Sequence, residues 1–181
     1  MQCGVDRQIT DDALRDAIAA CLPELRAAAR LLTGSRAEAD DLVQDAVVRM
    51  LRGAAGFVVA PEHAGDARAA LRPWAIAVLR NAFREGWRQR KREQAQLALR
   101  PPAEHGRSGG QESVARIRDL ARAIAALPPA LREALVLVGA QGLGHEQAAV
   151  ICGVPVGTMK ARVARARRQL ARSFGLDFPQ P

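Results

Sequence analysis

The chain has 181 residues and carries 27 Lys and Arg residues against 19 Asp and Glu residues, which gives a formal net charge of +8. Such an excess of positive charge favours a polyanionic partner, either nucleic acid or an anionic membrane surface. No apolar stretch approaches the roughly 20 residues that span a bilayer, and the N-terminus lacks the pattern of a signal peptide. We therefore expect no membrane insertion and a cytoplasmic protein of one domain or two small ones.

Composition favours helices over a sheet core. Hydrophobic residues make up 49% of the chain, but much of this is alanine and aromatic residues account for only 3%. Leu, Ala, Arg and Glu are good helix formers, and no convincing run alternates β-branched residues. We predict an all-α fold of two small helical domains, residues 1–93 and 114–181, joined by a flexible linker over 94–113.

Nothing in the sequence indicates catalytic or metal chemistry. Cys3, Cys21 and Cys152 are odd in number and far apart, so free thiols are expected. The three histidines share no ligand-like spacing with them or with one another. Without a nucleophile–base pair or a phosphate-binding loop, we expect no enzyme, no metal site and no cofactor.

The first predicted helix begins at Thr10, which is a plausible cap followed by two acidic residues. Pro23 is expected to kink or restart this helix, and Thr33–Gly34 ends it. Its apolar positions recur at helical spacing. They are Leu14, Ile18, Leu22, Leu25, Ala28, Ala29 and Leu32.

The second predicted helix follows a capping box formed by Ser35 and Glu38. Its inward positions are Ala39, Leu42, Val43, Ala46, Val47, Met50 and Leu51. Its other face carries Asp40, Asp41, Gln44, Asp45 and Arg49. An ordinary solvated face is one interpretation, but an acidic face on a basic protein is also a candidate for a protein partner.

Residues 53–71 are rich in Gly and Ala and are expected to form a loop, with a short helical piece near its end. Pro73 then suits the first position of a long helix. Trp74 is expected to lie in the core, and the alternative is contact with unstacked bases. The far end of this helix is basic and suits a DNA backbone. Its cations are Arg84, Arg88, Arg90, Lys91 and Arg92.

The segment 94–113 contains Pro101–Pro102 and Ser108–Gly109–Gly110, which favour a flexible linker. Its 20 residues have a mean reach of roughly 25 Å and a stretched limit near 65 Å. Two major-groove faces two turns apart on DNA are separated by about 70 Å. The linker could nearly bridge two such sites.

Two further helices are predicted after the linker. One spans 114–126, and the other begins at Pro129 and stops at Gln141–Gly142. The inward positions expected for the first are Val114, Ile117, Leu120, Ala121 and Ile124. Those expected for the second are Leu131, Leu135 and Val138.

A helix-turn-helix is predicted next. The first helix spans 145–151, the turn is Cys152–Gly153–Val154 with Gly153 free to take positive φ, and Pro155 opens the second helix. The inward positions of the second helix are Met159, Val163, Ala166 and Leu170. Residues 155–172 hold six basic residues and no acidic one. A solvated helix usually mixes both signs, so this one favours contact with nucleic acid.

Taken together, these stretches resemble the extracytoplasmic-function (ECF) group of bacterial sigma factors over about residues 12 to 172. The resemblance is carried by LPELRAAARLLTGSRAEADDLVQDAVVRML, RPWAIAVLRNAFREGWRQRKR and IAALPPALREALVLVGAQGLGHEQAAVICGVPVGTMKARVARAR. The last string is most similar to the alphaproteobacterial general-stress-response sigma factors. The implied protein has two helical domains, no catalytic site, and binds core RNA polymerase and promoter DNA.

The resemblance also implies partners and site residues. The acidic face of Asp40, Asp41, Gln44 and Asp45 would dock on the β′ clamp helices, with the β flap and an anti-sigma factor as further partners. Asn81 matches the position that holds a flipped −10 base. The basic residues that would hold DNA near it are Arg84, Arg88, Arg90, Lys91 and Arg92. The residues that would face −35 bases are Lys160, Ala161, Ala164 and Arg165. The residues that would grip phosphates are Thr158, Arg162 and Arg167.

The chain departs from this pattern in places, and alternatives stay open. The 53–71 loop looks longer than usual, which puts the −10 preference in doubt, and Gly144 stands where a serine-like cap is frequent. A sigma-like decoy that sequesters an anti-sigma factor is the main rival, but it would carry a receiver domain and would not need the basic residues. An ordinary repressor or activator would need a ligand or phosphoacceptor domain.

Overall fold

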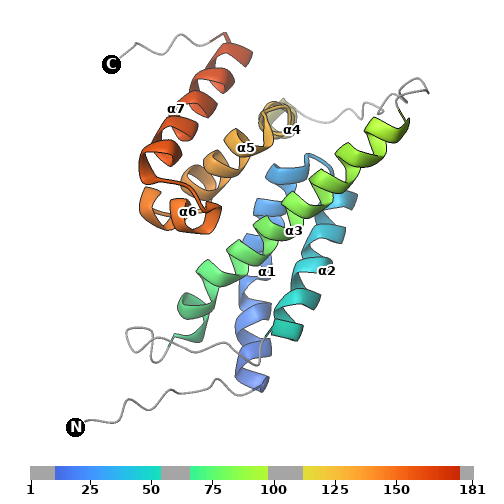
Figure 1. Cartoon of the computed structure of the whole chain (residues 1–181), viewed down its shortest axis with the longest axis vertical. Coiled ribbons are helices and arrows are strands. Elements are labelled where there is room, and N and C mark those ends of the chain that lie inside the picture. The colour runs from blue at the N-terminus through green and yellow to red at the C-terminus, as the bar shows by residue number, and fades with distance from the viewer. Residues whose placement is uncertain (1–10, 54–65, 98–111, 176–181) are drawn as a thin grey trace.

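The computed structural model describes residues 11–53, 66–97 and 112–175. The described residues form helices joined by short turns and contain no strand, which confirms the predicted all-α class (Figure 1). The elements are α1 (Asp11–Thr33), α2 (Arg36–Gly53), α3 (Ala67–Leu97), α4 (Glu112–Ala125), α5 (Pro129–Leu135), the π-helix η3 (Val136–Ala140), α6 (His145–Cys152) and α7 (Val156–Ser173). Most of the predicted 53–71 loop and 94–113 linker lies outside the described residues. Among the described residues, no helix combines the length and apolar character needed to cross a bilayer.

Helices α1, α2 and α3 pack side by side in the N-terminal unit. α1 runs without interruption through Pro23, so the helix is not restarted there. The proline side chain is exposed. Gly34 ends it with a φ of +77°, and its N–H donates to the carbonyl of Arg30 at 2.9 Å. This left-handed glycine lets α2 begin two residues later and turn back along α1.

The start of α3 differs from the prediction. The helix begins at Ala67, and Pro73 is its seventh residue rather than its first. The reason is an N-cap: the Asp66 carboxylate accepts from the N–H of Ala69 at 2.9 Å, and Leu71 is fully buried in the turn that follows. At its other end α3 continues to Leu97, four residues beyond the predicted boundary at 93.

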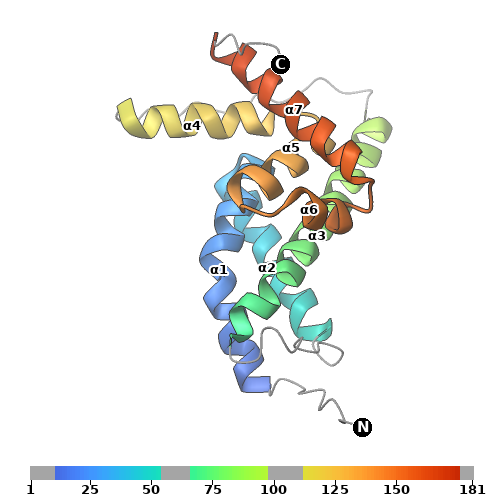
Figure 2. The same ribbon diagram turned by 90° about the vertical axis from the view of Figure 1, so that its left-hand side faces the viewer.

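Two of the inward predictions fail, and those for α5 and η3 are weaker than expected. Leu51 is 46% exposed because Met50, fully buried, takes the inward position in the last turn of α2. Leu120 is 44% exposed. Figure 2 shows α4 extending sideways from the bundle of α1, α2 and α3. Leu131, Leu135 and Val138 are only half-buried.

The buried positions of α5 and η3 lie on a different face from the predicted one. They are Glu133, Ala134, Val136 and Leu137. In η3 the N–H of Gln141 donates to the carbonyl of Val136 at 2.9 Å, one residue wider than an α-helical bond, and this shifts the phase of the helix.

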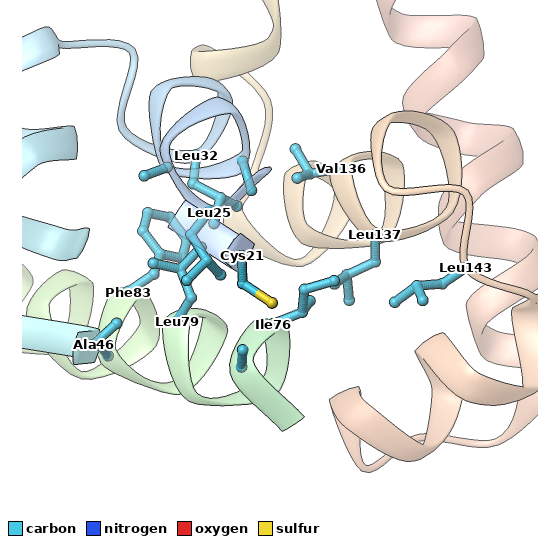
Figure 3. Packing of buried hydrophobic residues seen from close by; sticks show 14 of the residues in the cluster. Cys21, Leu25, Leu32, Ala46, Ile76, Leu79, Phe83, Val136, Leu137 and Leu143 are labelled. Carbon is cyan, nitrogen blue, oxygen red and sulfur yellow. The ribbon is translucent and has the colours of Figure 1, made fainter. Parts of the chain in front are cut away.

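The two units share one hydrophobic core. Leu25 and Leu32 of α1 and Leu79 of α3 belong to the same buried cluster as Val136 and Leu137 of η3, and Figure 3 shows these side chains side by side. Close packing of this kind makes the face between the units part of the interior. The thiol of Cys21 lies in the same cluster, and Cys21 and Cys152 are both free and buried.

Candidate nucleic-acid interface

The turn between α6 and α7 has the geometry of a helix-turn-helix. Gly153 ends α6 with φ 63° and ψ 42°, and its N–H donates to the carbonyl of Val150 at 3.1 Å. The N–H of Val154 donates to the carbonyl of Ala149 at 3.0 Å, so two carbonyls at the end of α6 are satisfied. Pro155 sits at the cap position directly before α7. The predicted turn is confirmed, and it sets the direction of α7.

One face of α7 is anchored in the C-terminal unit. Met159 and Ala166 are fully buried and Val163 nearly so, as the apolar spacing predicts. Leu170 is half-buried, and Ala171 takes the buried position in the last turn instead. A helix fixed along this stripe presents its remaining side chains outward.

The structure brings the predicted −35 residues together on that outward side of α7. Those that are exposed are Thr158, Lys160, Ala161, Ala164, Arg165 and Arg167, and Arg162 is half-buried. Among the described residues, no acidic side chain forms an ion pair with this helix. Of the four residues predicted to face bases, Ala161 and Ala164 are short, and Lys160 and Arg165 are long and charged.

The predicted −10 residues lie along α3, and most of them are exposed. Asn81 is exposed, and its Oδ1 accepts from Arg80 at 3.0 Å. Lys91 lies over the ring of Trp87, 5.3 Å from its centroid, which places a cation and an aromatic ring together near the end of the helix. The other exposed cations are Arg88, Arg90 and Arg92. Arg84 is not free, since its guanidinium lies 3.4 Å from the carboxylate of Glu133.

The predicted acidic face lies on α2. Asp41, Gln44 and Asp45 are exposed, and Asp40 is half-exposed. Beside this face, a groove of about 230 Å³ runs between α2 and α3, with Asp41 and Asp45 in its lining. Leu42 also lines this groove. The groove has an apolar floor that includes Leu42 and Phe83, and its edges carry Asp41 and Asp45 together with the cation of Arg90.

Asp45 is tied to a neighbouring pair on α3. It accepts from Arg49 at 3.0 Å, and the same guanidinium donates to Glu85 at 2.5 Å. The bond to Asp45, followed by that to Glu85, raises the pKa of Arg49 above its ordinary value. Arg49 therefore stays charged and joins α2 to α3 under the acidic face.

Two families of protein domains match the chain. Residues 17–93 match Sigma-70 region 2, and residues 117–170 match Sigma-70 region 4. The chain is 39% identical over 166 residues to the ECF RNA polymerase sigma factor EcfG of Rhodopseudomonas palustris, a match that covers 92% of this chain and 87% of the relative. The chain belongs to the ECF sigma factors.

Two further likenesses agree with this assignment. The sigma factor is 35% identical to the ECF RNA polymerase sigma factor SigC of Mycobacterium tuberculosis, over 73% of this chain and 68% of the relative. Its structure matches the sigma factor RpoE of Bartonella quintana, solved in complex with the anti-sigma factor NepR. The TM-score is 0.72, the identity is 32%, and the match covers 93% of this chain and all of that one. The protein is therefore a regulator of transcription from a family without catalytic activity.

Two residues that connect the units of this sigma factor were not predicted from the sequence. Arg80 and Glu133 form an ion pair of 2.9 Å between α3 and α5, with exposed side-chain fractions of 11% and 0%. The available signals were an arginine inside the apolar run AVLRNAF and a glutamate inside ALREALVLV. Charged residues are almost never fully buried unless they are paired, but the sequence does not say with which residue.

Proposed function

We propose that this ECF sigma factor binds core RNA polymerase and directs it to promoters that carry specific −35 and −10 elements. The outward face of α7 is the observation that supports this most. It is basic, free of acidic partners among the described residues, and held by a buried stripe on its other side. Lys160 and Arg165 would contact guanine edges or phosphates in the major groove, and Arg162 and Arg167 would grip phosphates with Thr158.

The proposed −10 contacts follow from α3. Asn81 is exposed and offers an amide that can both donate to and accept from the edge of a flipped base. The cations of the following turns would neutralise strand phosphates, which makes affinity fall as salt rises. They are Arg84, Arg88, Arg90, Lys91 and Arg92.

We propose the acidic face of α2 as the polymerase-docking surface. Its residues are Asp40, Asp41, Gln44 and Asp45. The exposed carboxylates and the adjoining apolar groove favour a basic helical element such as the β′ clamp helices, and the C-terminal unit would contact the β flap. Complementary charge at such a surface directs encounter and fixes orientation.

An anti-sigma factor is proposed as the regulator. The likeness to a sigma factor solved in complex with the anti-sigma factor NepR supports this partner. Together with the likeness to EcfG, it favours a role in the general stress response. We place the protein in the cytoplasm with the polymerase. We propose two promoter-reading units near the predicted bounds 1–93 and 114–181, with α3 extending to Leu97 and α4 beginning at Glu112.

In vitro transcription with core polymerase on a library of upstream sequences tests the proposal. We expect transcripts from a defined subset of templates only when the protein is present. Arg165→Ala should remove about 1–3 kcal/mol of base readout, which corresponds to roughly 5- to 150-fold less transcript from those templates. Gln169→Ala, an exposed change on the same helix, is the matched control.

Two outcomes would contradict these assignments. Initiation that is identical with and without the protein on every template would exclude a promoter-directing role and would leave a decoy that captures an anti-sigma factor. If Arg165→Ala reduced binding to the polymerase instead of promoter selection, α7 would not be the −35 reader.

A further inference from the structure

Trp87 is a large aromatic residue of α3 that the hydrophobic core does not use. Phe83 of the same helix belongs to the buried cluster, and Trp74 is packed against it, but Trp87 does neither. Its side chain is nevertheless half-buried. An indole ring offers a large apolar surface that contributes to stability only where a partner covers it. Among the described residues, the core provides no such partner for Trp87.

The group that covers the ring is a cation. Lys91, one turn further along α3, holds its Nζ over the ring of Trp87, 5.3 Å from the centroid. Lys91 and Arg88 are both exposed, and neither forms an ion pair with an acidic residue in the described part of the chain. An aromatic ring beside unpaired cations is the combination that holds single-stranded nucleic acid, since bases stack on the ring and cations neutralise the phosphates.

Trp87 continues a row of side chains that starts at the proposed −10 reader. Asn81, Arg84 and Trp87 are three residues apart along α3, and residues at this spacing are neighbours on a helix surface. The row therefore presents an amide, a cation and an aromatic ring in succession. Six residues advance about 9 Å along a helix, and stacked bases are about 3.4 Å apart along a strand. The ring is thus level with a base two or three nucleotides from the one at Asn81.

A base can replace the cation on this ring. A cation–π contact at an exposed site is weaker than the stacking of a base on an aromatic side chain. The ammonium group of Lys91 that leaves the ring can then neutralise a neighbouring phosphate. In a duplex the faces of each base are covered by its neighbours, so the base must first be unstacked. The ring therefore distinguishes an open strand from paired DNA.

We propose that Trp87 is a base-stacking residue of this sigma factor. Its indole stacks on an unpaired base two or three nucleotides from the base held by Asn81, and Lys91 neutralises the adjoining phosphate. The proposal rests on the assignment of α3 as the −10 reader, since Trp87 extends the row that begins at Asn81. Because every base has a π-face, the contact tolerates any sequence and favours the open promoter over the duplex.

The first test compares Trp87→Ala and Trp87→Phe in holoenzyme assembled from core polymerase and the full-length chain. The probe is a fork of a promoter found in the transcription library, with the strand of its −10 element left unpaired. Trp87→Ala should bind this fork roughly 5- to 150-fold more weakly than the wild type. Trp87→Phe should retain most of the affinity, because phenylalanine also offers a ring. Gln89→Ala, an exposed change on the same helix, is the matched control and should bind as the wild type.

The second test removes one base at a time from the unpaired strand and keeps its phosphate. For the wild type, one missing base should weaken binding by the same factor as Trp87→Ala. This base should lie two or three nucleotides from the one at Asn81. In Trp87→Ala the same missing base should cost nothing further, whereas loss of the base at Asn81 should weaken both proteins. Circular dichroism establishes that each variant is folded.

The stacking role is overturned if folded Trp87→Ala holoenzyme binds the intact fork as tightly as the wild type. It is also overturned if the variant binds more weakly but every missing base costs it as much as it costs the wild type, since the ring then only supports α3. Failure of the proposed function looks different. In that case the wild-type holoenzyme binds the fork no better than core polymerase alone.

Discussion

At the scale of the residue, the direction of the recognition helix depends on one backbone angle. Gly153 has a φ of 63°, a region in which any residue with a Cβ is strained. An added methyl group there would meet no atom within 4 Å. The cost of substitution would therefore come from the backbone alone.

We expect Gly153→Ala to lower the free energy of unfolding by about 1–2 kcal/mol, the cost of placing an L-residue in the left-handed region. Gly157→Ala is the matched control, since it lies at the start of α7 with negative φ and open space around it. Alanine there should not destabilise the protein, because alanine is the better helix former. Urea unfolding of the two variants measures both effects, and equal losses would contradict this account of the turn.

The conformation of the turn and of α7 could be predicted because it depends on residues that are close together in the sequence. The positive φ of Gly153 and the buried stripe of Met159, Val163 and Ala166 follow from residue type and spacing. Glu133 could not be found in the same way. Its partners lie 53 and 49 residues away, and spacing along a helix contains no information about such pairs.

At the scale of the element, Arg49 of α2 pairs with two acidic residues that we expect to differ in function. Asp45 and Glu85 both pair with Arg49, but Asp45 lies on the proposed docking face and Glu85 on α3. A surface pair of this kind contributes little to stability. Substituting either acid should leave the fold intact.

We expect Asp45→Ala to weaken binding to core polymerase by about 1 kcal/mol, the upper end for exposed charge pairs, or roughly fivefold in affinity. Glu85→Ala removes the other partner of Arg49 and should leave the affinity unchanged. Competition for polymerase against a labelled sigma factor, measured at moderate salt, compares the two. Equal effects of both variants would assign the loss to Arg49 and not to a docking contact.

The start of α3 shows why the boundary of a helix is hard to predict from sequence. Proline is common at the first position of a helix, and this general preference placed the start at Pro73. The signal that decides the boundary is Asp66, whose carboxylate caps the N–H of Ala69. Asp66 lies in a Gly- and Ala-rich stretch, and the burial of Leu71 that favours this start depends on packing against other helices.

At the scale of the whole molecule, two helical units were predictable but their shared core was not. Each unit has its own amphipathic helices, so periodicity separates them. The burial of Ile76 and Leu79 together with Val136 and Leu137 depends on how the units meet. The alternation of apolar residues shows which face of a helix is buried but not which helix covers it.

A shared core predicts that the units unfold together. Removing the contact between them would expose the apolar face of each unit to water and cost the hydrophobic free energy of that area. We therefore expect the wild-type protein to show one calorimetric transition whose van't Hoff and calorimetric enthalpies agree. Glu133→Gln should broaden or split this transition, since each unit then unfolds with less help from the other, while Glu85→Gln should keep it single. Two separate transitions in the wild-type protein would mean that the shared core contributes too little to couple the units.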